Sequence, residues 1–330
     1  MIITQKELEK TLKELDTIIQ VYREKYSVWT ERSWRTKEQE YAHRLKTAAQ
    51  ELKPVIKEAY NMIEVAKSNV GRPPNMDVQK KVLLLLLKEI FQMSNRKMAI
   101  FLAFFSVLSD IEISYKSIER CYSEELVRLT IHNMFVILTK RKEIKCPETC
   151  GDGTGYTLTI TKHYRNEREK QLKGCEEKSK KAFVYVFALM DLSTGMYIGY
   201  GTSLKSEKEA FEKALMMTGE AEISIDSIRL DRYYSSRGIV KEFGPGTKIY
   251  VLPKKNANIR GPYQWKRILQ SFIRDPFVFL REYYKRNNSE AGFSADKRAF
   301  GWKVCQKREE RIDTALLCKG VWHNLFLLGK

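Results

Sequence analysis

The stretch Tyr283–Lys297 reads YYKRNNSEAGFSADK and surrounds one central acid, Glu290, with regularly spaced partners. Tyr283 lies seven residues before Glu290, Arg286 lies four before it, and Lys297 lies seven after it. At 3.6 residues per turn these offsets fall within roughly 60° of arc, so a continuous helix would place all four side chains on one face. An acid beside two cations and a phenol suits metal binding next to phosphate groups, which is what chemistry on a nucleic-acid backbone needs.

The same pattern also fits a solvated amphipathic helix in which Arg286 and Glu290 form an i, i+4 charge pair. Residues 287–289 and Gly292 are poor helix formers, so a helix that begins only near Ser289 is an alternative. That start would take the earlier side chains off the shared face.

The composition indicates a globular chain with a polyanionic partner. Its 330 residues suffice for two or three domains, and 43% of them are hydrophobic. Lys and Arg number 59 against 41 Asp and Glu, a net charge of +18, which favours nucleic acid or an acidic membrane surface as the partner. The segment Lys254–Arg311 alone holds 15 basic and 6 acidic residues. The charge is therefore concentrated around the Glu290 stretch.

The sequence predicts neither a membrane span nor secretion. The longest apolar runs, Val82–Leu87 and Met98–Leu108, are too short to cross a bilayer, and the first residues lack the apolar run of a signal peptide. We therefore expect a cytoplasmic, nucleoid-associated protein with no membrane partner. Scattered cysteines are typical of reduced thiols, and a zinc site from Cys146, Cys150, Cys305 and Cys318 is a weaker alternative because no CxxC pair occurs.

The N-terminal part, residues 1–70, is predicted to be helical. Its first run carries an apolar stripe at a spacing of three and four residues, comprising Leu8, Leu12, Leu15, Ile18, Ile19 and Tyr22. A second run extends from about Lys37 to Val70. Gly71, Pro73 and Pro74 then end the pattern, so residues 71–76 are predicted to be a linker. The GRPP sequence also resembles a minor-groove arm, although a simple linker is the more common reading.

Residues 77–142 are predicted to form a DNA-binding region of the helix-turn-helix kind. Val78–Phe91 is the first helix, Ser94 is a good N-cap for a second helix from Asn95 to about Phe105, and Tyr115–Cys121 can form a third. The candidate DNA-binding side chains are Arg96, Lys97, Lys116 and Arg120. A plain helical bundle fits the same pattern.

After residue 142 the periodicity changes from 3.6 to 2. Thr154–Tyr164, Ala182–Met190 and Met196–Thr202 are predicted strands, with a hairpin turn from Asp191 to Gly195. The expected order continues as helix Ser206–Met217, strand Ser227–Leu230, helix Ser235–Phe243, strand Lys248–Leu252 and a long helical region from Tyr263. Three strands followed by this alternation is the order of a ribonuclease H-like domain, predicted over residues 143–330. The expected fold class is thus multidomain, all-α and then a mixed-sheet α/β domain.

In that fold an acid on the first strand, one at the end of the fourth and one on a late helix can meet, and Asp152, Asp231 and Glu290 occupy these places. Such oxygen ligands suit two Mg²⁺ or Mn²⁺ ions, and we predict these three acids to be both catalytic and metal-binding. Asp152, between glycines, is alternatively a turn residue. Asp226 and Asp191 compete with Asp231, but a strand-entry position and a hairpin turn explain them better.

The spacing Tyr-(2)-Arg-(3)-Glu-(6)-Lys resembles the signature of bacterial and archaeal insertion-sequence transposases of the Asp-Asp-Glu class. LDRYYSS is similar to that family's second-acid motif, and SNRKMAIFL and SYKSIERCYS resemble its N-terminal DNA-binding region. The resemblance covers roughly residues 71–329. It implies that Arg286 and Lys297 hold backbone phosphates at the transposon end and that Tyr283 helps to position this DNA. We add the neighbouring Arg298 to these candidate DNA contacts.

Some relatives insert a β-domain between the second and third acids, carrying a tryptophan that stacks on a flipped base. Only 59 residues separate Asp231 from Glu290, which leaves no room for that insertion. Trp265 is the candidate substitute, and the resemblance leaves open whether the element ends pass through a DNA hairpin.

The leading hypothesis is a DNA transposase that binds the inverted-repeat ends of an insertion sequence, cuts there and joins the freed 3′-hydroxyl to double-stranded target DNA. Handling two ends together favours a homodimer. The alternative is a transposase-derived DNA-binding regulator without catalysis. A tyrosine recombinase fits poorly, because no arginine and histidine cluster is evident.

Overall fold

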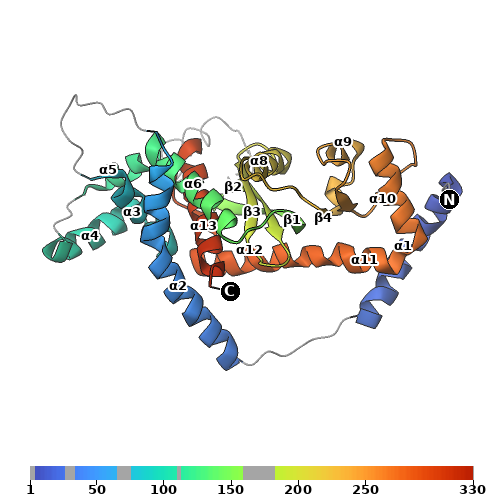
Figure 1. Cartoon of the computed structure of the whole chain (residues 1–330), viewed down its shortest axis with the longest axis horizontal. Coiled ribbons are helices and arrows are strands. Elements are labelled where there is room, and N and C mark those ends of the chain that lie inside the picture. Colours follow the sequence, from blue (N-terminus) through green and yellow to red (C-terminus); the bar gives the residue numbers. More distant parts are fainter. Residues whose placement is uncertain (1–3, 27–33, 65–75, 110–112, 159–182, 330) are drawn as a thin grey trace, which may run out of the picture.

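The computed structural model describes residues 4–26, 34–64, 76–109, 113–158 and 183–329. Figure 1 shows a group of helices at one end of the molecule, a mixed sheet in the middle, and α9 and α10 with α1 at the other end. The predicted combination of a helical N-terminal part with a later α/β part is confirmed at this level. Among the described residues, no helix has both the length and the apolar character needed to cross a bilayer.

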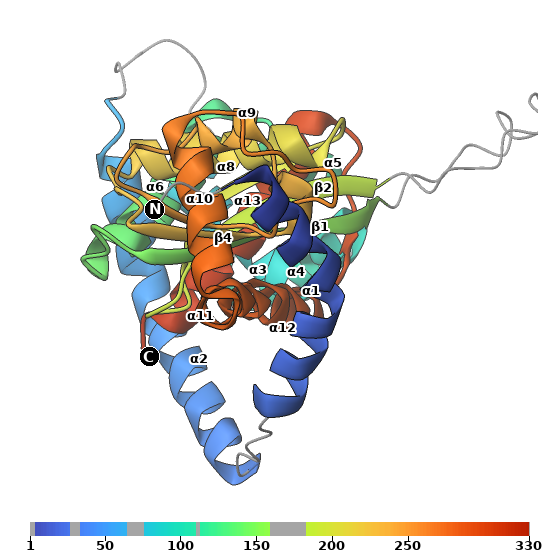
Figure 2. The ribbon, with the colours of Figure 1, turned by 90° about the vertical axis from the view of Figure 1, so that its right-hand side faces the viewer.

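The N-terminal run consists of two helices that pack in different places. α1 (Gln5–Tyr26) buries Leu8, Leu12 and Leu15 against α10 and α11, whereas α2 (Trp34–Asn61) packs on α6 and α13. Figure 2 shows α1 and α2 on opposite sides of the molecule. The predicted continuation of helix to Val70 and most of the linker 71–76, with its GRPP sequence, lie outside the described residues.

The three short helices predicted after residue 77 are present. They are α3 (Val78–Ile90), α4 (Asn95–Ser109) and α5 (Tyr115–Cys121), and α6 (Glu125–Arg141) follows them. The Ser94 hydroxyl accepts a hydrogen bond from the Lys97 amide, as its N-cap position predicts. These helices share one apolar core with α2, α13 and one face of the sheet.

The sheet has six strands, namely β1 (Glu148–Leu158), β2 (Phe183–Asp191), β3 (Tyr197–Ser203), β4 (Ser227–Leu230), β5 (Lys248–Tyr250) and β6 (Lys303–Val304). Their order is β3-β2-β1-β4-β5, with β6 beside the end of β1. β2 pairs antiparallel with both β1 and β3. β4 and β6 pair parallel with β1, and β5 pairs parallel with β4. The central strand is therefore β1.

β1 begins at Glu148, six residues earlier than predicted, because three glycines that suggest a turn lie within the strand. At Gly153 a Cβ atom would lie 2.3 Å from the carboxyl carbon of Glu207 at the start of α8 (Glu207–Glu220), so that side chain would have to move to admit one. The interpretation of Asp152 as a turn residue is therefore wrong. The helix predicted at Ser235–Phe243 is also shorter, since only Arg237–Val240 forms α9.

Each face of the sheet has its own core, as the alternation of β2 requires. Val184 and Val186 face the core shared with α12 and α13, whereas Phe187 and Leu189 face the core formed with α8. Burial on both faces explains why β2 is an almost continuous apolar run.

The long helical region predicted from Tyr263 onward is confirmed. It contains α10 (Tyr263–Arg274), α11 (Pro276–Tyr283), a 3₁₀ turn (Tyr284–Arg286), α12 (Asn287–Phe300) and α13 (Glu309–Leu327). The path from Tyr283 to Lys297 is thus helical almost throughout, with one tighter turn at its start.

A buried arginine ties this helical path to the sheet. Arg229, 1% exposed within β4, lies 2.5 Å from Glu282 at the end of α11 and 3.3 Å from Glu148 at the start of β1. Its ring neighbour is Tyr250 on β5, 5.0 Å away. One side chain therefore joins three strands to the segment that carries Tyr283 and Arg286.

Removing Glu282 should destabilise the protein, because a buried guanidinium loses its shortest ion pair. We expect Glu282→Ala to lower the free energy of unfolding by about 3 kcal/mol, as measured by urea denaturation. The matched control is Glu242→Ala, an exposed acid that should change stability little. Equal stabilities of the two variants would contradict this role of Arg229.

Candidate active site

The three predicted acids come together at one edge of the sheet. Asp152 lies within β1, Asp231 directly follows β4, and Glu290 stands in the first turn of α12. β1 and β4 are parallel neighbours with Gly151 opposite Leu230, so Asp152 and Asp231, the next residue of each chain segment, lie at the same level. The structure thus brings together residues that are 79 and 59 positions apart in the sequence.

A single side chain bridges all three carboxylates. The Arg286 guanidinium lies 3.0 Å from Glu290 Oε1 and 3.6 Å from Asp152 Oδ2, both through Nη1, and 3.5 Å from Asp231 Oδ2 through Nη2. Because Nη1 lies close to both oxygens, Asp152 Oδ2 and Glu290 Oε1 are themselves near each other. Arg286 Nε is buried and has no hydrogen-bond partner in the described part of the chain.

This bridging decides what the acids can hold. Within the described residues, no three His, Cys, Asp or Glu side chains are arranged to hold a metal ion as they stand. The Arg286 guanidinium instead contacts all three carboxylates. The donor set nevertheless fits Mg²⁺ or Mn²⁺, since it consists of carboxylate oxygens around a point where positive charge is already accommodated. Divalent ions would have to displace the Arg286 guanidinium to bind between the three carboxylates.

The electrostatics of the site favour a cation. Burial raises the pKa of Asp152 to about 6, against the lowering effects of the Gly153 amide and of Arg286. Burial alone would lower the pKa of Arg286, but Tyr283 and the three carboxylates outweigh it and raise that pKa above its ordinary value. The charged form of Asp152 would therefore gain from additional positive charge.

The residues flanking Glu290 occupy distinct positions. Tyr283 is 4% exposed, and its ring lies 5.6 Å from the Arg286 guanidinium. Lys297 donates a 2.6 Å hydrogen bond to Thr154 Oγ1 on β1, two residues beyond Asp152. Tyr283 thus packs in the interior beside Arg286, whereas Lys297 reaches from α12 to β1.

A cavity of about 610 Å³ opens beside the acids. Asp152 and Glu290 line it together with Lys297 and Arg298, and Trp302 forms part of its wall. Trp302 is 56% exposed. No pattern in the sequence singles it out, since it lies beyond the Glu290 stretch and only the packing of β6 beside β1 brings it here.

The expectation for Trp265 is wrong. Its side chain is 3% exposed in the α10 core and its indole Nε1 donates to the Asn258 carbonyl oxygen at 2.9 Å. It therefore cannot stack on a base without leaving that core.

Buried polar contacts fix α12 in place. Asp296 accepts a 2.8 Å hydrogen bond from the Tyr197 hydroxyl, and its other oxygen lies 2.7 Å from His323 Nδ1. His323 Nε2 lies 2.9 Å from the Gly195 carbonyl oxygen, and its ring stacks on Tyr197. These contacts attach the helix that carries Glu290 and Lys297 to the β2–β3 hairpin and α13, and the sequence gives no sign of them.

The four bases predicted to contact DNA in residues 77–142 are exposed, but they lie on α4 and α5, away from the acids. The Arg96 guanidinium lies 5.3 Å from the Tyr115 ring, so the first turns of the two helices are adjacent. None of these bases lines the cavity beside Asp152.

The cysteine alternative finds no support in the described residues. Cys121, Cys146, Cys150, Cys305 and Cys318 are free thiols, and they join no group of metal-binding side chains there.

Replacing Arg286 tests whether it acts as the counter-charge of the acids. Arg286→Ala should lower the unfolding temperature in the absence of metal, because the carboxylates then repel one another unshielded. Added Mn²⁺ should stabilise the variant more than the wild type, with binding tighter by about tenfold in isothermal titration calorimetry, since no guanidinium has to leave.

The control for this experiment is Arg298→Ala, which removes an exposed guanidinium from α12, the helix that follows the turn of Arg286. Unchanged stability and unchanged Mn²⁺ affinity in Arg286→Ala would contradict the interpretation.

Comparison with known proteins finds no matching family model and no matching solved structure. A curated protein of Archaeoglobus fulgidus, the probable transposase for insertion sequence element ISA1214, is 43% identical over 328 residues. The match covers 98% of this chain and 96% of that protein, and so includes both the helical part and the acid site. The chain therefore belongs to the family of insertion-sequence transposases to which that archaeal protein belongs.

Proposed function

We propose that this transposase is of the Asp-Asp-Glu class and acts by metal-dependent phosphodiester chemistry. It cuts DNA at the ends of an insertion sequence to free a 3′-hydroxyl, which then attacks double-stranded target DNA with no covalent enzyme intermediate. The observation that carries the proposal is the convergence of Asp152, Asp231 and Glu290 on one guanidinium. A structural role does not require three acids at one point, because their mutual repulsion costs stability.

The sheet supports a ribonuclease H-like catalytic domain. The strand order β3-β2-β1-β4-β5, with three antiparallel strands first and parallel pairing afterwards, is the order expected for that fold. The acids occupy the central strand, the end of its parallel neighbour and a late helix. This arrangement agrees with the sequence signature around Glu290.

The chain's own residues bind and orient the DNA. In this proposal Lys297 and Arg298 hold backbone phosphates along the cavity, and Arg286 moves from the acids to a phosphate when the carboxylates take up two Mg²⁺ or Mn²⁺ ions. Tyr283 is buried, so it acts through the Arg286 it supports. Bound ions would supply an activated water and neutralise charge developing on the phosphate.

Recognition of the ends is assigned to the helical part. The exposed bases on α4 and α5, Arg96, Lys97, Lys116 and Arg120, are the proposed contacts of a helix-turn-helix-like module. A homodimer would hold two ends together on the nucleoid DNA. A regulator that binds ends without cutting them is the alternative, and the convergence of the acids argues against it.

Amide substitution of the acids tests the chemistry. Asp152→Asn, Asp231→Asn and Glu290→Gln should each lower Mg²⁺-dependent cleavage of an element-end duplex by at least about a hundredfold, because each removes a charged metal ligand. End binding, measured by gel shift, should persist. Asp226→Asn is the control, since this exposed acid pairs with Lys248 away from the cavity, and it should cleave at the wild-type rate.

Cleavage that survives in all three amide variants would rule out the Asp-Asp-Glu assignment. A wild-type protein that binds ends but cleaves under no divalent metal would favour the regulator.

A further inference from the structure

The segment that follows Asp231 is the most basic part of the chain. Between Arg232 and Arg274 the sequence holds ten Lys and Arg residues and one acid, Glu242. The excess of positive charge in this segment is half of the net charge of +18 of the whole chain. Nine of these bases are exposed, namely Arg237, Lys241, Lys248, Lys254, Lys255, Arg260, Lys266, Arg267 and Arg274. None of the residues to which a DNA contact has been assigned so far lies in this segment.

Most of this charge is not neutralised by the protein. In the part of the chain that the structure describes, only Lys248 and Lys255 form salt bridges, to Asp226 at 3.6 Å and to Asp16 at 3.7 Å. Both pairs are exposed and contribute little binding energy. The segment therefore keeps a net positive field toward solvent.

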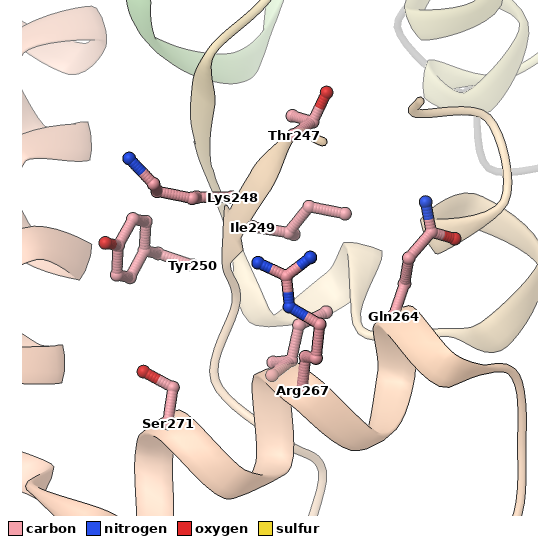
Figure 3. Close-up of a pocket in the computed structure, with 8 residues that line it drawn as sticks. Thr247, Lys248, Ile249, Tyr250, Gln264, Arg267 and Ser271 are labelled. Atoms are coloured by element: carbon pink, nitrogen blue, oxygen red, sulfur yellow. The ribbon is translucent and has the colours of Figure 1, made fainter. Parts of the chain in front are cut away.

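A hollow of about 230 Å³ lies within this segment, between the edge strand β5 and α10. Lys248 and Arg267 are its cations, Gln264 and the hydroxyls of Thr247, Tyr250 and Ser271 are its polar groups, and no acid lines it. Figure 3 shows Arg267 reaching from α10 toward β5. The guanidinium is held there by a 3.1 Å hydrogen bond to the Pro245 carbonyl oxygen and lies 5.9 Å from the Tyr263 ring.

Exposed aromatic rings accompany the cations. Tyr263 is 75% exposed beside Arg267, and Tyr233 is 60% exposed with Lys254 Nζ 5.9 Å from its ring. Cations, hydroxyls and an amide around a shallow hollow are the groups that proteins use to hold a phosphodiester backbone without reading its sequence. We give the name α10 basic surface to the residues that line the hollow together with four neighbours, namely Tyr233, Lys254, Tyr263 and Lys266. Lys248 and Arg267 are among the lining residues.

The hollow of the α10 basic surface and the cavity that contains Lys297 share no lining residue. In the sheet, β4 separates β1, which carries Asp152, from β5, which forms a wall of the hollow. Tyr233 stands two residues after Asp231, so its contact with Lys254 extends this surface to the acid site. Figure 1 shows α9 and α10 at one end of the molecule and α3, α4 and α5 at the other.

Strand transfer needs two DNA molecules at one set of acids. The oxygen of the free 3′-hydroxyl forms a bond to a target phosphorus and loses its proton, the P–O3′ bond of the target strand breaks, and the departing 3′-oxygen takes up a proton. No oxidant or further reactant is required. If the element end occupies the cavity with Lys297 and Arg298, the target phosphate has to approach from another side.

We propose that the α10 basic surface binds the target duplex, a role that rests on the proposed function. A duplex held there by sequence-independent phosphate contacts would present its backbone to the acids from the β4–β5 side. The surface then determines capture of target DNA rather than recognition of the element's own ends.

The double variant Lys248→Glu/Arg267→Glu tests this role. In a strand-transfer assay with pre-cut ends and a plasmid target, the ratio of transfer to end cleavage should fall by about tenfold, because two phosphate contacts are lost. A matched control is Lys205→Glu/Lys208→Glu, which reverses two exposed bases at the start of α8. If the double variant unfolds, the milder Arg267→Gln replaces it in the assay. This single variant should lower the ratio of transfer to end cleavage by a smaller factor.

Binding without catalysis provides a second measurement. The salt dependence of binding to a plain duplex without element ends should lose roughly 0.9 from its slope for each phosphate contact removed. Because this measurement needs no cleavage, it tests the α10 basic surface even if the proposed transposase chemistry fails.

Two outcomes would overturn the proposal. A parallel fall in cleavage and transfer would mean that the surface holds the element end, and an unchanged ratio with an unchanged salt slope would mean that it is only a solvated basic face.

Discussion

The attraction between one guanidinium and three carboxylates is the interaction around which the molecule is built. Asp152, Asp231 and Glu290 come from two strands and a helix, and Arg286 supplies the positive charge that they share. Acids brought this close without a counter-charge would repel one another or take up protons. The same constraint makes the site useful, because whatever replaces the guanidinium must also be positive.

Much of the surrounding structure serves to hold these groups in place. Gly153 leaves room for the Glu207 side chain beside Asp152, and Arg229 joins β4 to Glu282 just before the turn that carries Arg286. Asp296 attaches α12 to the β2–β3 hairpin through Tyr197 and His323. These contacts hold the strands and the helix that carry the acids. The carboxylates of Asp152 and Glu290 remain accessible from the cavity.

The sequence predicts the order of helices and strands and the convergence of the three acids, because periodicity and the spacing around Glu290 are local signals. It misplaces the start of β1, since Gly151, Gly153 and Gly155 look like a turn in the sequence. In the fold, side chains of β2 and of Glu207 fill the space beside them. It also misses Trp302 and the Asp296–His323 pair, because their partners lie far away in the chain. Trp265 looks available in the sequence, yet it is a core residue.

The most direct test of the account is the anomalous scattering of manganese in crystals of the wild-type protein soaked in Mn²⁺. The account predicts two peaks about 3.5–4 Å apart among the oxygens of Asp152, Asp231 and Glu290, with the Arg286 side chain displaced from its present position. No peak among these carboxylates at saturating Mn²⁺, with Arg286 still bridging them, would contradict it.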